Sequence, residues 1–276
     1  MPASAVDTEK RFAFGENWRR FLSVLNDERI AVAEDSLREM LQVESLSGKS
    51  FLDIGSGSGL FSLAAARLGA ARIHSFDFDP SSVACTEELK HRYFPGKTEW
   101  TVERGSVLDQ AYVSRLGQYD LVYSWGVLHH TGNMWLALEN VLQAVKPGGK
   151  LFIAIYSDRG WISRGWRAVK RTYITGQAGA ALVTAVFVPI FVGKGLAADL
   201  LRGRNPAKRY REYKKQRGMS MVHDWLDWLG GYPFEVATPQ RIRDFYERHG
   251  FRLTNFKSRQ HLNGNNEFVF LKPLAG

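Results

Sequence analysis

A buried-strand pattern that runs into a glycine-rich turn and then into a helix restricts the fold of this chain more than any other feature. Phe51–Ile54 has the apolar pattern of an interior strand, Gly55–Gly59 follows, and Leu60–Leu68 has helical periodicity. A second strand, predicted at Arg72–Phe76, ends beside Asp77. This order predicts a β-α-β unit in a parallel sheet, with turn glycines that let backbone N–H groups approach a ligand.

Short apolar runs continue to alternate with helical stretches as far as Tyr156, which is typical of an α/β protein with a doubly wound, mostly parallel sheet. Lys146-Pro147-Gly148-Gly149 is interpreted as a helix stop followed by a turn. Further strands are predicted at Trp100–Glu103, Asp120–Ser124 and Leu151–Tyr156. Further helices are predicted at Ser82–His91 and Met134–Val145.

Two segments do not follow this alternation. Residues 1–49 carry helical periodicity from Lys10 to Met40 and are predicted to form an N-terminal helical segment. Residues 157–232 have little strand character and are predicted to form a largely helical insertion after the fifth strand. We expect this insertion to act as a cap or substrate module.

The pattern of the sheet resumes near the C-terminus. Thr238 and Pro239 are the residue types that begin a helix, which is expected to end at Gly250. Strands are predicted at Phe251–Lys257 and Glu267–Leu271. Residues 50–156 and 233–276 are therefore expected to form one core.

The turn and the acid that follows the second strand suggest a nucleoside ligand. An ionised Asp77 can accept hydrogen bonds from both hydroxyls of a ribose. The glycines Gly55, Gly57 and Gly59 do not have the G-x-G-x-x-G spacing on which a pyrophosphate usually sits, and Asp53 lies two residues before the first of them. A nicotinamide dinucleotide and S-adenosylmethionine remain to be separated on these residues alone.

Several segments resemble the class I S-adenosylmethionine-dependent methyltransferases, including small-molecule and quinone-biosynthesis members. The resemblance covers about Ser50 to Tyr156, with weaker support from Thr238 onward. Where Ser106 stands, the family often has an acidic residue. The resembling segments are Leu52–Gly59, Phe76–Pro80, Gly105–Asp109, Tyr119–Ser124, Val127–His130 and Val145–Gly149.

The resemblance implies a Rossmann-like fold with a seven-stranded sheet, and S-adenosylmethionine as cofactor. By the resemblance, Asp53 and the turn would flank the methionine portion, Asp77 would bind the ribose, and Ser106 with Val107 would border the adenine. The implied cofactor-binding residues are Asp53, Gly55, Ser56, Gly57, Gly59, Asp77, Phe78, Ser106, Val107, Ser124 and Trp125.

Methyl transfer mainly requires alignment of a nucleophile and exclusion of water, so no metal is expected. A hydroxyl or phenol acceptor also needs a base, for which histidine is the usual side chain near neutral pH. His129 and His130 follow the fourth strand at the carboxyl edge of the sheet, where ligands bind in such folds. They are candidate catalytic residues, and the alternative is that they orient the loop by hydrogen bonds.

A second set of candidate catalytic residues lies in the insertion. His223 and Asp224 lie next to tryptophans in the sequence, and Tyr232 follows. In one site, the histidine would act as the base, the aspartate would orient it, and the aromatic residues would form an apolar wall for the substrate. The alternative is that these residues form the insertion's own core and surface. The segment Asn263–Glu267 is rich in hydrogen-bonding groups; we interpret it as an ordinary polar turn, and the alternative is that it reaches the cleft.

The insertion combines an apolar run with a basic stretch. Ala180–Val192 is strongly apolar, but Gly176, Gly179 and Pro189 are expected to leave it shorter than the roughly 20 residues of a membrane span. A buried cap helix or a membrane-surface element is expected. The basic stretch from Arg202 to Arg217 suits a solvated helix face, an anionic lipid or phosphorylated substrate, or RNA.

These features predict an enzyme that methylates a small, apolar or amphipathic acceptor. The alternatives are a transferase that moves another group of S-adenosylmethionine, such as the aminocarboxypropyl group, and a non-catalytic cofactor-binding or RNA-associated protein. An anionic membrane surface is a candidate partner, and nucleic acid is a weaker one. The single cysteine, Cys85, and the charged first residues favour a cytoplasmic protein, peripheral at the membrane if the insertion contacts lipid.

Overall fold

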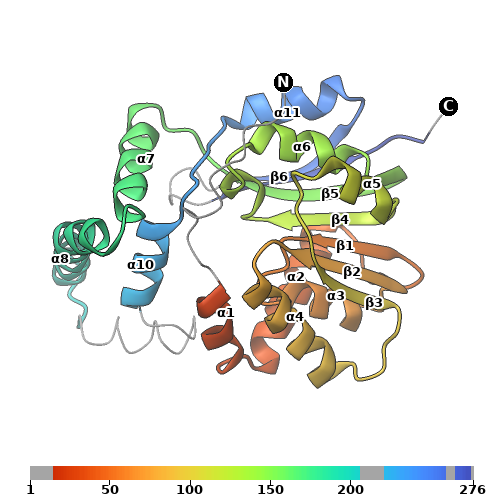
Figure 1. The fold of residues 1–276 in the computed structure, drawn as a ribbon, viewed down its shortest axis with the longest axis horizontal. Helices are drawn as coiled ribbons and strands as arrows, with labels where there is room; N and C mark the ends of the chain where they lie inside the picture. Colours follow the sequence, from red (N-terminus) through yellow and green to blue (C-terminus); the bar gives the residue numbers. More distant parts are fainter. Residues whose placement is uncertain (1–14, 206–220, 259–264, 275–276) are drawn as a thin grey trace. The chain divides into compact units, whose positions relative to one another are not determined.

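A seven-stranded sheet organises the described part of the chain, which comprises residues 15–205, 221–258 and 265–274 of a computed structural model (Figure 1). The strand order is β3-β2-β1-β4-β5-β7-β6. Neighbouring strands from β3 to β5 pair in parallel, whereas β7 runs antiparallel to both β5 and β6. The strands are β1 (Ser50–Ile54), β2 (Arg72–Asp77), β3 (Trp100–Arg104), β4 (Tyr119–Trp125), β5 (Val145–Tyr156), β6 (Arg252–Lys257) and β7 (Asn265–Leu271).

Helices contribute to two separate apolar cores that both include strand residues. One core joins β1, β2, β4 and β5 to α5 (Gln110–Leu116), α6 (Met134–Leu142) and α11 (Pro239–Arg248). The other core joins the sheet to α2 (Asp27–Leu41), α3 (Leu60–Arg67) and α4 (Pro80–Tyr93). Successive side chains of a strand point to opposite faces of the sheet, so the residues of β1 are divided between the two cores. Leu52 and Ile54 belong to the first core, and Phe51 belongs to the second. A mostly parallel sheet covered on both faces, with helices between its strands, is the fold class predicted from the sequence.

Side-chain caps determine where many of these helices begin. The capping oxygen accepts a hydrogen bond from a backbone N–H of the first turn, which that turn cannot satisfy internally. Proline occupies the first turn of α4 and α11, as predicted for Pro239. The caps are Asn26 for α2, Asp79 for α4, Asp109 for α5, Asn133 for α6 and Thr238 for α11.

The segment Lys146–Gly149 corrects one prediction. It lies within β5 and is not a turn after a helix, and α6 ends at Leu142, earlier than the predicted Val145. Backbone hydrogen bonds hold the segment in the sheet, because Gly148 N donates to Lys272 O and Lys272 N donates to Gly149 O. A Cβ on Gly149 would lie 2.9–3.1 Å from three carbonyl oxygens, so the strand needs glycine there.

Residues Gly160–Phe234 form a compact unit separate from the sheet unit, which comprises Gly15–Arg159 and Glu235–Gly276. The described helices of the first unit are α7 (Trp161–Tyr173), α8 (Gln177–Leu201) and α10 (Met221–Gly230). Aromatic rings join them: Trp166 lies 4.2 Å from Trp228 and 5.2 Å from Phe187 between ring centroids. We call Gly160–Phe234 the helical unit.

A buried lysine links two helices of this unit. Lys170 of α7 donates from Nζ to the carbonyl of Trp228 in α10. Its Nζ also lies 4.6 Å from the Trp228 ring centroid and 5.1 Å from that of Phe234. Burial lowers the pKa of Lys170 to about 7.

Candidate active site

The turn after β1 is shaped so closely by its surroundings that glycine is required at two positions. Gly55, Gly57 and Gly59 have φ values of 76°, 55° and 79°, which side-chain-bearing residues rarely adopt. A Cβ on Gly55 would lie 2.4 Å from Val127 Cγ1, and one on Gly59 would lie 2.8 Å from Thr86 Cα. The turn leads directly into the first turn of α3, where backbone N–H groups favour a polar ligand.

Hydrogen bonds tie this turn to the end of β2. The N–H groups of Gly55 and Ser56 donate to Phe76 O at 2.8 and 3.1 Å. Gly57 N donates to Oδ2 of Asp77 at 3.0 Å. The acidic residue after the second strand and the glycine turn therefore form one continuous structure, as the sequence predicted from their order.

Asp77 keeps hydrogen-bonding capacity for a ligand. Its Oδ1 accepts from Asp79 N at 2.9 Å while Oδ2 accepts from Gly57. A backbone hydrogen bond from Phe78 also acts on this carboxylate, and because a carboxylate has about four acceptor sites, Asp77 still has acceptor capacity for a ligand hydroxyl. Burial raises the pKa of Asp77 to about 6, although the backbone hydrogen bonds oppose this shift. The Phe78 side chain next to it is partly open to solvent.

Asp53 is held inside the sheet unit and not at its open edge. Its Oδ2 accepts from Ser62 Oγ at 2.5 Å, and Ser62 shares a further hydrogen bond with Ser75. Trp100 Nε1 donates to the same Ser75 hydroxyl at 2.9 Å. Burial raises the pKa of Asp53 to about 7, and the negative charge of Asp77 adds to this shift. Asp53 therefore lies behind the turn, where it anchors α3 to β1.

The loop after β3 lies beside Asp77. Gly105 N donates to Asp77 O at 3.0 Å. Ser106 is half-buried, and its Oγ accepts from the backbone N–H of Leu108. Val107 is buried, and its carbonyl accepts from Asn140 Nδ2 at 2.9 Å. The structure thus brings the loop predicted to border the adenine next to the acid predicted to bind the ribose.

The end of β4 carries one buried and one open candidate residue. Ser124 is fully buried, and its Oγ donates to Ile54 O at 3.0 Å, which joins β4 to β1. Trp125 is 39% exposed, and its Nε1 donates to Glu267 Oε1 at 3.0 Å. Ser124 is therefore placed to hold the strands together, whereas Trp125 presents a ring at the carboxyl edge.

An aromatic cluster follows β4. His129 and His130 form the short 3₁₀ helix η2 (Leu128–His130), with ring centroids 4.5 Å apart. Tyr156, at the end of β5, lies 4.3 Å from His129 and 5.6 Å from His130 between ring centroids. His129 is buried and His130 is half-buried. His129 O accepts from Glu235 N at 2.9 Å, which fixes the loop that carries both rings.

Three polar residues of β4 and β7 were not among the sequence candidates. Glu267 and Asn265 belong to the start of β7 and are buried, although their segment was interpreted as a polar turn. Tyr123 of β4 pairs in register with Asp53, and its buried hydroxyl has no hydrogen-bond partner within the described ranges. The run of polar residues directly before an apolar strand is the sequence feature that would have identified Glu267 and Asn265 as site residues.

The helix α1 (Gly15–Leu22) supplies a further side chain at the turn. A Cβ on Gly57 would lie 3.1 Å from Trp18 Cε2, so the indole lies directly against the turn. The Trp18 ring also contacts Phe21 edge-on, with centroids 6.4 Å apart. The predicted N-terminal helical segment therefore lines the turn predicted to hold the cofactor.

The candidates from the insertion belong to the helical unit. His223 and Asp224 lie in α10, and their side chains are outside the described part of the structure. Tyr232 is half-buried and precedes Pro233 through a cis peptide bond. Catalytic roles for these three residues stay predictions. No group of three metal-binding side chains occurs in residues 15–205, 221–258 and 265–274.

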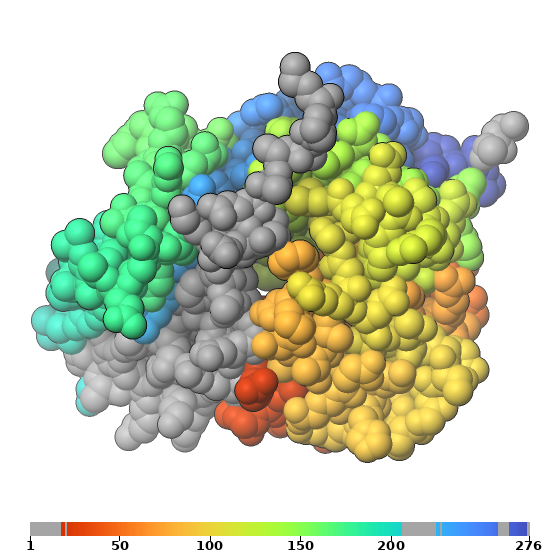
Figure 2. Space-filling model, viewed as in Figure 1, coloured from red at the N-terminus to blue at the C-terminus, as the bar shows by residue number. Residues whose placement is uncertain are grey.

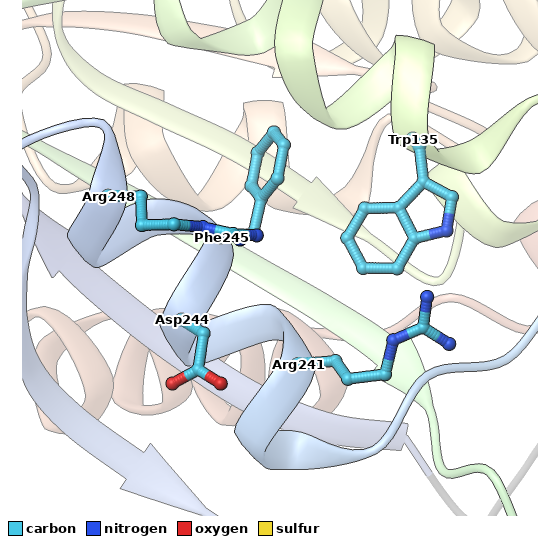
Figure 3. Close-up of a pocket in the computed structure, with 5 residues that line it drawn as sticks. All are labelled: Trp135, Arg241, Asp244, Phe245 and Arg248. Atoms are coloured by element: carbon cyan, nitrogen blue, oxygen red, sulfur yellow. The ribbon is translucent and has the colours of Figure 1, made fainter.

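A surface pocket on the sheet unit lies apart from all these residues (Figure 3). Trp135 of α6 forms one wall, and four residues of α11 form the other. Arg241 stacks its guanidinium 5.0 Å from the Trp135 ring centroid, and Phe245 lies 5.5 Å from the same ring. The pocket therefore contains none of the predicted cofactor or catalytic side chains.

Comparison with known proteins gives a consistent result. Residues 52–151 match a family model described as a methyltransferase domain. The chain is 31% identical over 168 residues to the ubiquinone biosynthesis O-methyltransferase of Methylobacterium sp. (strain 4-46), covering 57% of this chain and 62% of that protein. It is also 31% identical over 117 residues to the ribosomal protein L11 methyltransferase of Methylococcus capsulatus, covering 42% of this chain and 36% of that protein.

A solved structure has the same fold. The magnesium protoporphyrin IX methyltransferase of Synechocystis PCC 6803, with bound SAH, superposes with a TM-score of 0.54 at 14% identity and covers 93% of each chain. The two curated relatives above are matched over less than two thirds of their own length, so their similarity concerns a domain and not their whole chains.

Proposed function

The sheet unit is a class I S-adenosylmethionine-dependent methyltransferase domain, and on this premise we propose that the chain methylates a small acceptor at the carboxyl edge of β1, β2 and β4. S-adenosylmethionine is its cofactor. Bound there, the cofactor supplies a sulfonium-activated methyl group, whose transfer leaves S-adenosylhomocysteine.

One observation carries this proposal: the hydrogen bond from Gly57 to Asp77 joins the glycine turn to the acid of β2. Gly55 and Gly59 have no room for a Cβ because Val127 and Thr86 pack against them, so the turn is held in one conformation beside Asp77. Asp77 retains acceptor capacity for a ribose hydroxyl. The adjoining loop at Ser106 supports a place for the adenine beside it.

The acceptor side would be formed by the residues that follow β4 and β5. His130 is the better candidate base of the two histidines, because it is half-buried whereas His129 is buried. Tyr156 supplies ring surface beside it, and the exposed Trp125 follows at the end of β4, which suits an apolar or amphipathic acceptor. In this role His130 would take the proton of a hydroxyl acceptor as the oxygen attacks the methyl carbon.

The direct test is product analysis with methyl-labelled cofactor and a panel of phenols, quinols and amphipathic hydroxyl compounds. The proposal predicts labelled acceptor together with one equivalent of S-adenosylhomocysteine, and loss of both with Asp77→Ala. Formation of methylthioadenosine would instead indicate transfer of the aminocarboxypropyl group. If His130 is the base, His130→Gln should lower kcat by about 10² or more.

A further inference from the structure

The helix α8 exposes an apolar surface that a water-soluble helix normally buries. It is long and apolar enough to cross a membrane, and only 6% of its most apolar 18-residue stretch is buried inside the molecule. Tyrosine, threonine, glutamine and apolar residues occupy positions 172–193, without a single charge. A helix that is apolar on all sides is expected either in a protein core or in contact with lipid.

One side of α8 is already occupied within the helical unit. Phe187 contacts Trp166 of α7, with centroids 5.2 Å apart. Phe191 lies 5.5 Å from Trp225 and 6.1 Å from Trp228 of α10. These aromatic contacts fix which side of α8 faces its neighbours.

The other side carries apolar residues one helical turn apart. Leu182, Val186 and Ile190 are 61%, 47% and 42% exposed, and Leu200 continues the exposed surface toward the end of the helix. Pro189 lies on the same side and is exposed. Because proline has no backbone N–H, the carbonyl one turn earlier lacks its helical hydrogen bond, and on this side that carbonyl lies at the surface of the helix and not in a core. We call Leu182, Val186, Ile190 and Leu200 the apolar face of α8. In Figure 2 the green surface of α7 and α8 is open to view.

The net charge of the chain is concentrated in the same unit. Residues 160–234 contain 13 Lys or Arg against 4 Asp or Glu, a net +9 that equals the formal charge of the whole protein. The rest of the chain is therefore neutral overall. On α7, the exposed residues Trp161, Arg164 and Arg171 lie on one side of the helix, and this combination is typical of helices at a membrane surface.

We propose that the helical unit docks on a bilayer that carries anionic lipid headgroups, with the apolar face of α8 in the interface. The helix lies along the surface and does not span the bilayer, because spanning would break its aromatic contacts with α7 and α10 and would bury Lys194 and Asp199. This inference does not depend on methyl transfer, since none of its residues belongs to the candidate active site.

Two other occupants fit these observations less well. A second copy of the helical unit would bring together two units that each have a formal charge of +9, which charge repulsion opposes. RNA would suit the charge but would leave the apolar face of α8 in water, because that face offers no side-chain hydrogen-bonding group to a phosphate or a base. An anionic bilayer matches both the charge and the apolar surface.

Vesicle sedimentation with the full chain tests the proposal. We expect the protein to bind phosphatidylcholine vesicles that contain phosphatidylglycerol, and to bind pure phosphatidylcholine at least tenfold more weakly. Raising the salt concentration should weaken binding, because headgroup attraction is screened. A wash at alkaline pH should release the protein, as expected for a helix that lies in the interface.

Substitutions on α8 and α7 separate the two contributions. Val186→Glu with Ile190→Glu should reduce vesicle affinity at least tenfold. The matched control is Val32→Glu, because Val32 is 65% exposed on α2 of the sheet unit. Arg164→Gln with Arg171→Gln should reduce affinity about 25-fold, from roughly fivefold per basic residue. Lys49→Gln with Arg252→Gln removes the same charge from exposed positions of the sheet unit and should have little effect.

Several results would overturn the proposal. Absence of binding to anionic vesicles by the folded wild type would remove it, and so would equal losses in the α8 pair and Val32→Glu. Salt-sensitive RNA binding without vesicle binding would assign the charge to nucleic acid. A dimer that Val186→Glu and Ile190→Glu dissociate, without vesicle binding, would assign the apolar face to a second copy. Resistance to the alkaline wash would replace docking by a membrane span.

Discussion

The sheet unit and the helical unit use apolar and charged residues in opposite ways. In the sheet unit, Leu52, Ile54 and Phe51 are buried in two cores, and the formal charges of the residues outside 160–234 cancel. In the helical unit, α8 leaves Leu182 and Ile190 exposed, and the unit carries the whole net charge of the chain. Exposed apolar residues and net charge therefore occur together in the helical unit, and the sheet unit combines buried apolar residues with no net charge.

This difference indicates a division of labour. In the sheet unit, the half-buried Asp77 lies at the edge where a cationic cofactor would bind, and the buried Asp53 lies behind the glycine turn. In the helical unit, the surface proposed to bind lipid is exposed to solvent and consists of the apolar face of α8 and the exposed arginines of α7. Changes in one unit should therefore alter its own readout and leave that of the other unchanged.

The largest effect is expected from Asp53→Asn. Because the folded pKa of Asp53 is raised to about 7, the folded state holds a proton that the unfolded state has lost, and stability falls as pH rises from about 4 to 7. Removing the charge should raise the unfolding free energy of the cofactor-free protein at pH 8 by about 4 kcal/mol, and by little at pH 4. Urea unfolding at both pH values measures this.

Asp120→Asn is the control for that change, because it should alter the free energy of unfolding at pH 8 in the opposite direction. Hydrogen bonds from Ser50 and the charge of Lys146 outweigh burial and lower the pKa of Asp120 to about 2, so its contribution is present above about pH 4 and is lost as pH falls. Asp120→Asn should therefore destabilise the protein at pH 8. A loss of stability at pH 8 in Asp53→Asn as well would contradict the assigned burial cost, and vesicle binding should be unchanged in both variants.

Gly59→Ala should weaken cofactor binding by about a hundredfold, or about 2.7 kcal/mol. A Cβ at this position would meet Thr86 Cα at 2.8 Å and push the turn away from α4. Gly48→Ala is the matched control, since Gly48 has φ 73° but nothing lies within 4 Å of its added Cβ. Both changes cost about 1 kcal/mol of backbone strain. Equal cofactor affinity in the two variants, measured by calorimetry, would show that the turn does not hold the cofactor.

Cofactor affinity should depend on pH through Asp77. Its pKa is raised to about 6, so the carboxylate is protonated below that pH and accepts the ribose hydroxyls less well. Affinity should be constant above about pH 7 and fall about tenfold per unit below pH 6. Asp77→Asn should bind weakly with no such dependence, whereas Asp120→Asn should keep the wild-type profile. A wild-type affinity that does not change between pH 5 and 8 would contradict this assignment.

The smallest effects come from a pair of tryptophans, one in each unit. Trp125→Phe removes the hydrogen bond to Glu267 and should lower kcat/KM for the acceptor about fivefold, from roughly 1 kcal/mol. Trp161→Phe, at a residue that is 75% exposed on α7, should leave turnover unchanged and weaken vesicle binding a few-fold. A turnover defect in Trp161→Phe would break the proposed separation of the two units.

Local patterns were sufficient to predict the strands other than the first part of β5, the glycine turn and the place of Asp77, because strand, turn and helix follow one another within one β-α-β unit. The position of His129 and His130 after β4 also follows from local order. Glu267 was missed as a site residue because its burial results from pairing of β7 with β5, more than one hundred residues away in the chain. Short-range periodicity does not contain such a contact.

Two predictions failed because tertiary contacts override residue preference. Lys146–Gly149 reads as a turn in isolation, yet its hydrogen bonds to Lys272 place it in β5. Pro189 was expected to interrupt the apolar run, yet α8 continues through it to Leu201. A buried cap helix was one expectation for that run, and the exposure of Leu182 and Val186 contradicts it within the described residues.

The most direct test of the account is calorimetric titration of S-adenosylmethionine into the wild type and Asp77→Ala at pH 7.5. The account predicts one binding site in the wild type and at least a tenfold loss of affinity in a variant that remains folded by circular dichroism. Absence of binding to the folded wild type, or equal affinity in Asp77→Ala, would contradict the assignment of the cofactor site to the turn and the acid of β2.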